Sequence, residues 1–221
     1  MKIFKQTERK KDRLLLVFAG WSVSPELFHH LKIAEEREVW ICYDYRDLNF
    51  PEDISRFEDI QIIAWSFGVW ITEKTLPVFS SPVVTTAIAI NGTPFPIHDS
   101  LGIPEAVFKG TLENLSEDGI RKFNRRMCGN KEILQYYETI RPRPVEEIKK
   151  ELYHLDAFYT HTAPVEAGSS FWTRAIISTA DRIFPVGNLK RYWEGRCPVR
   201  YIEAPHYPFY KWKQWEEIWK E

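Results

Sequence analysis

Four short apolar runs in the first half of the chain constrain its fold more than any other feature. They span residues 13–20, 38–44, 59–65 and 83–91. Each run is too short for a typical helix, is rich in aliphatic residues and is bounded by polar residues or glycine, which is typical of buried strands. The segments between the runs have helical character. An alternation of strands with helices predicts an α/β fold with a mostly parallel sheet.

Two of the segments between the strands carry clear helix signals. Residues 24–36 open with Ser24 as the N-cap and Pro25 at the first helical position, which is a common start of a helix. Residues 66–79 continue directly from the third apolar run, and we expect that helix to end near Pro77. Each helix is then expected to form a right-handed crossover between parallel strands.

The pattern changes between residues 93 and 168, where no strand signal is visible and several short charged helices are expected. We expect these helices at residues 116–129, 130–140 and 145–159. Strand signals return at residues 173–181 and 197–205, and the chain ends in a tryptophan-rich segment, 209–221, that we expect to be helical. The sequence therefore predicts one α/β domain over residues 1–221, with a helical lid inserted at 93–168.

Composition excludes several classes of protein. The 221 residues include 30 basic and 31 acidic side chains, a formal net charge of −1, so no global field attracts nucleic acid or an anionic membrane. The cysteines are odd in number and widely spaced, which indicates neither a disulfide framework nor a zinc site; they are Cys42, Cys128 and Cys197. The apolar stretch at 14–21 is too short to span a bilayer and has no signal-type context. We therefore expect a soluble cytoplasmic protein without nucleic-acid or membrane partners.

One serine occupies the position that nucleophilic catalysis requires. Ser66 stands in the segment AWSFG, between the third apolar run and the helix that follows. A nucleophile elbow has small residues two positions before and two positions after the serine, and its tight turn lifts the hydroxyl above the sheet. Gly68 fills one small position, and Ala64 fills the other, where glycine is usual. The alternative is a serine that only caps the helix.

Candidates for the other two catalytic groups follow later strands. A serine nucleophile needs a histidine to take its proton and a carboxylate to orient that histidine. Asp181 and His206 both come at the carboxyl ends of predicted strands, the edge of the sheet where Ser66 also lies, and the order Ser, Asp, His is that of α/β-hydrolases. Taken singly, Asp181 could cap a loop, His206 could be a surface histidine, and Asp44 is a rival acid. Three suitable residues after three strands favour the catalytic interpretation.

Acyl transfer also needs N–H donors for the oxyanion that develops in the transition state. The N–H of Phe67, directly after the serine, can supply one, and the loop after the first strand is expected to supply a second. In that loop Gly20 lets the backbone turn close to the site, and the N–H of Trp21 is placed to point inward. The alternative is a plain turn with a core tryptophan.

Other titratable side chains do not form a recognisable site. Those that come closest to a metal pattern lack carboxylate or cysteine partners at ligand spacing; they are His29, His30, His154, Asp156 and His161. The sequence also has no glycine-rich loop of the kind that cradles phosphate. We therefore expect neither a metal nor a nucleotide cofactor.

These motifs resemble a known family. The order of elements is similar to the α/β-hydrolase superfamily across nearly the whole chain. Five segments, FAGWS, AWSFGVW, INGTPFPI, STADRIFP and APHYPF, resemble the small biotin-synthesis esterases that cleave the methyl ester of pimeloyl-acyl carrier protein. The resemblance implies Ser66 as nucleophile, His206 as general base and then acid, and Asp181 as the orienting carboxylate. It also implies an oxyanion hole from the N–H groups of Trp21 and Phe67.

The same resemblance implies a substrate and a partner. Trp21, Trp65 and Phe67 are candidates to wall an apolar channel for the pimeloyl chain, and Trp70 is a fourth that suits the core better. An acyl carrier protein is acidic, so its docking site is expected to be basic. Basic residues of the insertion that fit this role are Arg121, Lys122, Arg125, Arg126, Arg141 and Arg143, with Lys149 and Lys150 nearby. The alternative is a solvated helix face, because glutamates are interspersed.

The sequence thus predicts a serine carboxylesterase that acts on the methyl ester of pimeloyl-acyl carrier protein. Two alternatives stay open. One is a thioesterase or short-chain esterase with another substrate, since ester and thioester hydrolysis use the same residues and the fold does not separate them. The other is a noncatalytic module that binds acyl carrier protein or another ligand on a hydrolase scaffold. In that module Ser66 would never be acylated.

Overall fold

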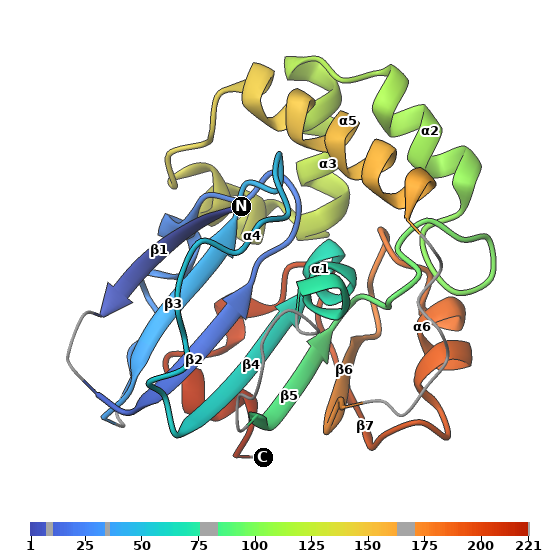
Figure 1. Ribbon diagram of the computed structural model, residues 1–221. Helices are drawn as coiled ribbons and strands as arrows, with labels where there is room; N and C mark the ends of the chain where they lie inside the picture. Colours follow the sequence, from blue (N-terminus) through green and yellow to red (C-terminus); the bar gives the residue numbers. More distant parts are fainter. Residues whose placement is uncertain (8–10, 34–35, 76–83, 163–170, 221) are drawn as a thin grey trace.

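One seven-stranded sheet organises the chain (Figure 1). The computed structural model describes residues 1–7, 11–33, 36–75, 84–162 and 171–220. The strands are β1 (Lys2–Thr7), β2 (Arg13–Phe18), β3 (Glu38–Tyr43), β4 (Asp59–Trp65), β5 (Val84–Ile90), β6 (Arg174–Ser178) and β7 (Val199–Ile202). Their order across the sheet is β1-β3-β2-β4-β5-β6-β7, and all neighbours are parallel except β1 and β3. The predicted mostly parallel sheet is confirmed.

The six predicted strands form the parallel part of the sheet, and the apolar runs of its central strands are covered on both faces. Residues 14–18 of β2, for example, are 0% exposed. Strand β1 is not predicted from the sequence, and its composition explains why. Its residues KIFKQT are mostly half-exposed and include two lysines. Edge strands often carry lysine, which discourages pairing with another chain, so β1 resembles a polar terminal segment.

Helix α1 (Phe67–Thr75) begins directly after Ser66 and is buried along most of its length. Its start agrees with the predicted helix at 66–79. The predicted end near Pro77 lies outside the described residues. Because α1 packs against β4 and β2, it fixes the turn that carries Ser66 against the middle of the sheet.

Two segments expected to be helical do not form the predicted helices. The helix predicted over 24–36 is wrong: a short 3₁₀ helix, η1 (Pro25–Phe28), forms there, and Ser24 makes no side-chain cap hydrogen bond. Residues 34–35 lie outside the described residues. The C-terminal segment likewise forms two 3₁₀ helices, η3 (Phe209–Lys211) and η4 (Trp215–Ile218), in place of one continuous helix.

These two segments pair with each other, which explains the missing helices. The N–H of Lys32 donates to the carbonyl of Lys213 at 2.9 Å, and the N–H of Trp215 donates to the carbonyl of Lys32 at 3.0 Å. The ring of Phe28 packs against those of Phe209 and Trp215, with centroids 4.9 and 5.6 Å apart. Backbone groups bonded between segments cannot also form a helix. Figure 1 shows the C-terminal segment on the face of the sheet opposite α1.

Within the part of the chain that the structure describes, four helices lie between β5 and β6: α2 (Glu105–Glu113), α3 (Glu117–Cys128), α4 (Lys131–Glu138) and α5 (Val145–His161). We call them the helical insertion. Figure 1 shows them gathered over the edge of the sheet where β4 ends. The predicted helices at 116–129, 130–140 and 145–159 correspond to the last three. The expected end of the insertion, at 168, lies outside the described residues.

Local capping explains why two of these helices could be predicted. The side chain of Ser116 accepts from the N–H of Gly119 at 3.1 Å, and that of Asn130 accepts from the N–H of Ile133 at 2.9 Å, so α3 and α4 have strong N-cap signals. Helix α2 has no such cap and buries only Phe108. It is not predicted, and neither is α6 (Val186–Trp193), which packs beside β6.

No helix in the described part of the chain combines the length and the apolar character that crossing a membrane requires.

Candidate active site

Ser66 lies in the turn between β4 and α1. Its φ is 59°, in the left-handed region that residues other than glycine seldom adopt. Its N–H donates to the carbonyl of Ile90 in β5 at 2.9 Å, and its carbonyl accepts from the N–H of Val69 at 3.1 Å. These bonds hold a strained backbone between a strand and a helix, which is the geometry of a nucleophile elbow.

The turn closes because its neighbours are small. A Cβ added to Gly68 would lie 2.2 Å from the carbonyl oxygen of Phe18, and one added to Gly92 would lie 2.3 Å from that of Ser66. Ala64 is fully buried and lies in register with Phe18 of β2. The sheet therefore accommodates its methyl group, and the turn forms without glycine at that position.

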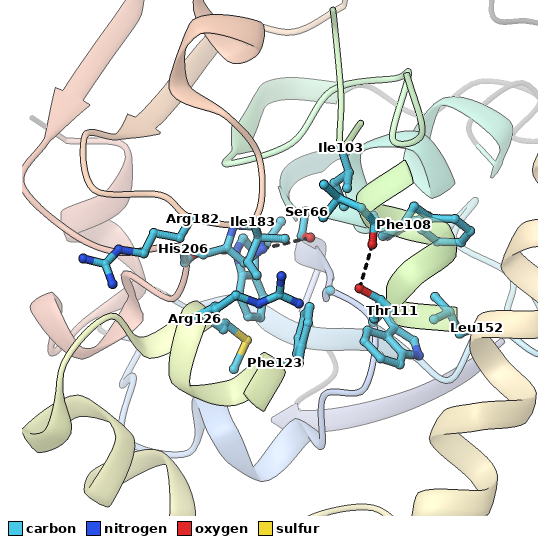
Figure 2. A pocket seen from close by; sticks show the side chains of 16 residues that line it. Ser66, Ile103, Phe108, Thr111, Phe123, Arg126, Leu152, Arg182, Ile183 and His206 are labelled. Carbon is cyan, nitrogen blue, oxygen red and sulfur yellow. Dashed lines mark hydrogen bonds between the residues drawn. The ribbon is translucent and has the colours of Figure 1, made fainter. Parts of the chain in front are cut away.

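Ser66, His206 and Asp181 form a continuous hydrogen-bonded chain. His206 Nε2 lies 3.0 Å from Ser66 Oγ (Figure 2), and His206 Nδ1 lies 2.7 Å from Asp181 Oδ2. Asp181 Oδ1 accepts from the N–H groups of Ile183 at 2.7 Å and Phe184 at 3.0 Å. The three residues are 5%, 1% and 8% exposed in that order. The structure thus brings together, at hydrogen-bond distances, the three side chains that the sequence analysis selected.

Asn91 holds the loop that carries His206. Its Nδ2 donates to the carbonyl of His206 at 2.9 Å and to Ser178 Oγ at 2.7 Å, while its Oδ1 accepts from the N–H of Ser178 at 2.7 Å. The indole N–H of Trp65 donates to the same His206 carbonyl at 2.9 Å, and the ring of Phe184 lies parallel to the imidazole. Asn91 was missed as a site residue, although it directly follows a strand at the same edge of the sheet.

A cavity with about 30 Å³ of free volume lies above Ser66. Trp21, Trp65 and Phe67, the predicted pocket residues, line it from the sheet side. The insertion and the segment before it supply the facing wall, which Figure 2 shows; its residues are Ile103, Val107, Phe108, Thr111, Phe123 and Leu152. Trp70 is 1% exposed and belongs to the core. The walls are mostly apolar, so the cavity suits an aliphatic chain.

Trp21 joins the loop after β2 to the helical insertion. Its indole N–H donates to the carbonyl of Ile148 in α5 at 2.9 Å, and its ring meets that of Phe123 in α3 edge-on at 4.9 Å. Gly20 lies directly against the elbow, because a Cβ added there would be 3.3 Å from Ser66 Cβ. The loop therefore brings the backbone of Trp21 next to Ser66.

The N–H of Phe67, the other candidate oxyanion donor beside that of Trp21, lies at the start of α1. Phe67 is the first residue of that helix, and the N–H groups of a first helical turn have no acceptor within the helix. The N-terminal end of a helix also favours negative charge. The backbone at Phe67 is therefore suited to a developing oxyanion beside Ser66.

Five of the predicted basic residues are exposed on the insertion. Arg121, Lys122, Arg125 and Arg126 are exposed on α3, and Arg141 is exposed between α4 and α5. We call these five residues the basic face.

Two arginines also line the mouth of the cavity. Arg126 belongs to the basic face, and Figure 2 shows its guanidinium directed towards the cavity. Arg182, next to Asp181, was not selected from the sequence, and in Figure 2 its guanidinium points away from Ser66. One end of the basic face therefore reaches the opening above Ser66.

Arg143 is buried, so its assignment to a carrier-protein surface is wrong. Its side chain is 7% exposed, and Nη1 lies 2.6 Å from Glu151 while Nη2 lies 3.0 Å from Asp44. Glu151 also accepts from the N–H of Tyr45 at 2.9 Å, and burial raises the pKa of Glu151. One guanidinium thus pairs with two buried carboxylates and joins α5 to the end of β3. Asp44, the rival acid, is engaged here and does not bind His206.

This ion pair predicts a large effect on stability. Arg143→Ala is expected to lower the free energy of unfolding by about 3 to 5 kcal/mol, because it leaves the buried carboxylate of Glu151 without its counter-charge. Arg141→Ala removes an exposed arginine two residues away and is expected to change the free energy by less than about 0.5 kcal/mol. Urea unfolding followed by tryptophan fluorescence measures both. Equal, small changes would contradict the structural role of Arg143.

Asp44 is expected to make stability depend on pH. Burial acts to raise the pKa of Asp44, but hydrogen bonds from Arg46 and Lys2 and the charge of Arg143 outweigh it and hold that pKa well below its ordinary value. A carboxylate with a depressed folded-state pKa stabilises the fold fully above its unfolded pKa of about 3.9, and the stabilisation is lost as the pH falls below that value. Asp44→Asn is therefore expected to cost more unfolding free energy near neutral pH than at about pH 3. Urea midpoints at both pH values test this, and a cost independent of pH would contradict it.

Three of the four histidines considered as metal ligands lie within hydrogen-bond distance of main-chain carbonyls. The partners are Phe209 for His30, Lys150 for His154 and Ala157 for His161. Among the residues that the structure describes, no three His, Cys, Asp or Glu side chains gather as a metal site would require.

The strand order, the turn at Ser66 and the hydrogen-bonded chain at the carboxyl edge of the sheet together define an α/β-hydrolase. A solved esterase from Exiguobacterium antarcticum shares this fold, with a TM-score of 0.67 and 13% identity over 95% of this chain and 89% of that one.

Within that class, the chain belongs to the BioG family: the sequence model described as "Pimeloyl-ACP methyl esterase BioG" matches residues 1–218. The crystal structure of BioG from Haemophilus influenzae is 40% identical, covers 100% of both chains and superposes with a TM-score of 0.93. A Bacteroides fragilis protein named malonyl-[acyl-carrier protein] O-methyltransferase is 43% identical over 201 residues, which are 89% of this chain and 40% of that protein. This chain thus spans less than half of that relative. The predicted family is confirmed.

Proposed function

We propose that this chain is a serine carboxylesterase that hydrolyses the methyl ester of pimeloyl-acyl carrier protein. The observation that carries the proposal is the buried chain from Ser66 to His206 at 3.0 Å and from His206 to Asp181 at 2.7 Å. Membership of the BioG family supports the choice of ester and carrier. The free state of Cys42, Cys128 and Cys197 suits a reducing cytoplasm, where we place the reaction.

The reaction proceeds in two halves that share the same groups. Ser66 Oγ attacks the ester carbonyl while His206 Nε2 takes its proton, and the N–H groups of Phe67 and Trp21 stabilise the oxyanion. The intermediate collapses as His206 returns the proton to the departing methoxide, so methanol leaves and Ser66 is acylated. Water, activated by His206, then attacks the acyl-enzyme. The products are methanol and a free pimeloyl carboxylate on the carrier.

Asp181 acts on the histidine and not on the substrate. Its Oδ2 holds Nδ1 of His206 at 2.7 Å, while its Oδ1 is fixed by the N–H groups of Ile183 and Phe184. A carboxylate held in this way keeps the proton of neutral His206 on Nδ1, so Nε2 is free to accept the proton of Ser66. It also stabilises the imidazolium that forms.

The helical insertion is proposed to act as a lid. The free volume of about 30 Å³ above Ser66 has room for about two water molecules, which is too little for a pimeloyl chain. The acyl chain therefore needs side chains of the insertion to move aside. Trp21 of the loop after β2 and Phe123 of the helical insertion meet edge-on, with ring centroids 4.9 Å apart. We expect these two rings to separate when the substrate enters.

The basic face is proposed as the docking site of the carrier. Arg121 is paired with Asp118, but among the described residues no ion-pair partner is found for Lys122, Arg125 or Arg126. Exposed positive charge attracts an acidic partner and speeds its association. Since Arg126 also lines the cavity mouth, the docked carrier would deliver its acyl chain directly to the opening.

One observation favours a second candidate, a short-chain esterase. Because the free volume above Ser66 is small, a short ester requires less movement of the insertion than a pimeloyl chain does. The methyl transfer named for the Bacteroides fragilis relative is not proposed here, because this chain spans only 40% of that protein and has no glycine-rich loop for a nucleotide-derived cofactor.

Two substrates and two products separate the candidates. Methanol release is measured with the pimeloyl-carrier methyl ester and with dimethyl pimelate. Release of the carrier thiol is also measured with the pimeloyl-carrier methyl ester. We expect kcat/KM for methanol to be higher by roughly 10²-fold when the ester is on the carrier. Arg125→Glu is expected to lower that value and leave dimethyl pimelate unaffected. Lys213→Glu, an equal charge change on the exposed C-terminal segment, is the control.

Each competing function gives a different result. Equal kcat/KM for the two methyl esters would favour a short-chain esterase. Release of the carrier thiol in place of methanol would favour a thioesterase. Binding of the carrier without any product would favour a noncatalytic module and would overturn the proposal.

A further inference from the structure

The segment that carries His206 is a loop. Residues 203–208 connect β7 to η3, and the sheet holds this loop through the carbonyl of His206, which accepts from Asn91 and Trp65. These bonds fix one carbonyl and not the residues on either side of it. The direction of the imidazole therefore also depends on what holds the two neighbours of His206.

The C-terminal end of α3 contacts both of these neighbours. On one side, the N–H of Tyr207 donates to the carbonyl of Met127, in the last turn of α3, at 3.1 Å. On the other side, Pro205 lies against Gly129, which ends that helix. Met127 and Tyr207 are 1% and 0% exposed, and Pro205 is also buried. The helical insertion thus contacts the loop directly before and directly after His206.

Gly129 meets Pro205 too closely for a side chain to fit between them. A Cβ added to Gly129 would lie 2.8 Å from Pro205 Cβ and 3.5 Å from its Cγ, and the rigid pyrrolidine ring cannot rotate out of the way. Gly129 also has a φ of 74°, and its N–H donates to the carbonyl of Arg125 at 3.0 Å, which is a common end of a helix. That backbone alone would admit asparagine as well. The close approach to Pro205 is a second and stricter reason for glycine.

Gly195 shows that the two requirements are separable. Its φ is 83°, but a Cβ added there would meet no atom within 4 Å. Gly195→Ala would therefore be strained only in its backbone. Gly129→Ala would carry the same kind of strain and would also push on Pro205.

The packing around the loop would pass such a push on to His206. The ring of Tyr207 contacts those of Tyr137 in α4 and Trp65 in β4, with centroids 5.8 and 6.0 Å apart. Close-packed interiors have low compressibility and transmit strain. A displacement of Pro205 therefore changes the position of the imidazole next to it.

We propose that Gly129 is a positioning residue for His206. By letting α3 end directly against Pro205, it seats the loop so that Nε2 stays 3.0 Å from Ser66 Oγ and Nδ1 stays 2.7 Å from Asp181 Oδ2. A misplacement of about 1 Å can lower a rate by about 10²-fold. The helical insertion is then part of the catalytic machinery as well as a cover, and the inference rests on His206 as the base of the proposed esterase.

Two matched glycine substitutions test the inference. Gly129→Ala is expected to lower the rate constant for labelling of Ser66 by a fluorophosphonate at least about tenfold, because the added Cβ displaces Pro205 and with it His206. Gly195→Ala makes the same change at a similar φ without a contact, and it is expected to keep the rate constant within about twofold. Thermal unfolding shows that both variants are compared in the folded state. Equal rate constants for the two folded variants would overturn the inference.

Removal of the proline side chain separates the contact from an effect on α3 itself. In Pro205→Gly, the nearest remaining atom of residue 205 is its Cα, 4.0 Å from the Cβ that Gly129→Ala adds. In this background Gly129→Ala is expected to lower the rate constant by less than about threefold, because the two residues no longer clash. The same loss in both backgrounds would overturn the inference. The double variant lacks the clash and is expected to fold, so this comparison also decides if Gly129→Ala alone does not fold.

The proton that His206 Nδ1 directs at Asp181 gives a readout that needs no substrate. We expect a far-downfield proton resonance from it at the same position in the unmodified protein and in Gly195→Ala, and we expect that resonance to move or disappear in Gly129→Ala. An unchanged resonance in folded Gly129→Ala would overturn the inference. If Ser66 of the unmodified protein is not labelled, the proposed esterase function fails, and this resonance then decides the role of Gly129.

Discussion

Ser66→Ala is expected to lower kcat/KM for methyl-ester hydrolysis by at least about 10⁴-fold, because the nucleophile that forms the acyl-enzyme is lost. What remains is the modest acceleration that oxyanion donors and substrate binding provide without a nucleophile. The fold is expected to persist, since the backbone bonds from Ser66 to Ile90 and Val69 do not use the side chain. Methanol release at initial rates measures the loss.

Ser55→Ala is the matched control. Ser55 is exposed and lies in the segment before β4, so the same chemical change is expected to leave kcat/KM within a factor of two or so of the starting value. Thermal unfolding of both variants shows whether either change acts through the fold. If Ser66→Ala kept a substantial part of the activity while remaining folded, another residue would have to be the nucleophile.

Asp181→Asn is expected to lower kcat/KM by roughly 10⁴-fold through the tautomer of His206. The two backbone N–H groups of Ile183 and Phe184 would keep the amide oxygen of the asparagine at the position of Oδ1. The amide NH₂ would then face Nδ1 of His206, which would have to accept. The imidazole proton would move to Nε2, and that nitrogen could no longer take the proton of Ser66.

Asp44→Asn is the control for this assignment, because Asp44 is the other aspartate that follows a strand at the same edge of the sheet. It lies in the ion pair with Arg143, so the change is expected to lower stability and leave kcat/KM nearly unchanged below the unfolding temperature. Activity of both variants is compared at the same folded fraction. Loss of activity in Asp44→Asn together with retention in Asp181→Asn would exchange the roles of the two aspartates.

The parallel sheet and its three key side chains could be predicted because they depend on short-range sequence patterns. Strands that are covered on both faces must be nearly continuous in apolar residues, as residues 14–18 are. A residue that directly follows such a strand lies at the carboxyl edge, whatever the rest of the chain does. Ser66, Asp181 and His206 could therefore be grouped in space before their distances were known.

Elements that depend on distant partners could not be predicted in the same way. Residues 24–36 carry a helix start, but the backbone of Lys32 bonds to the C-terminal segment, and no local pattern reveals that pairing. Arg143 lies in a basic and glutamate-rich stretch and was assigned to the surface for that reason. Its burial depends on Asp44 and Glu151, which lie far apart in the sequence.

Asn91 shows the same limit within the site. It follows β5 in the segment INGTPFPI, one of the segments that carry the family resemblance. Its importance comes from Ser178 and from the carbonyl of His206, so it is visible only once three strands are placed side by side. Positions of side chains along strands could be predicted, whereas the bonds that hold a loop in place could not.

Formation of an acyl-enzyme at Ser66 is the central claim, and intact-protein mass spectrometry after treatment with a fluorophosphonate tests it most directly. The account predicts one covalent adduct on the unmodified protein, located at Ser66 by peptide mapping, and none on Ser66→Ala. An unlabelled protein, or an adduct that persists in Ser66→Ala, would contradict it.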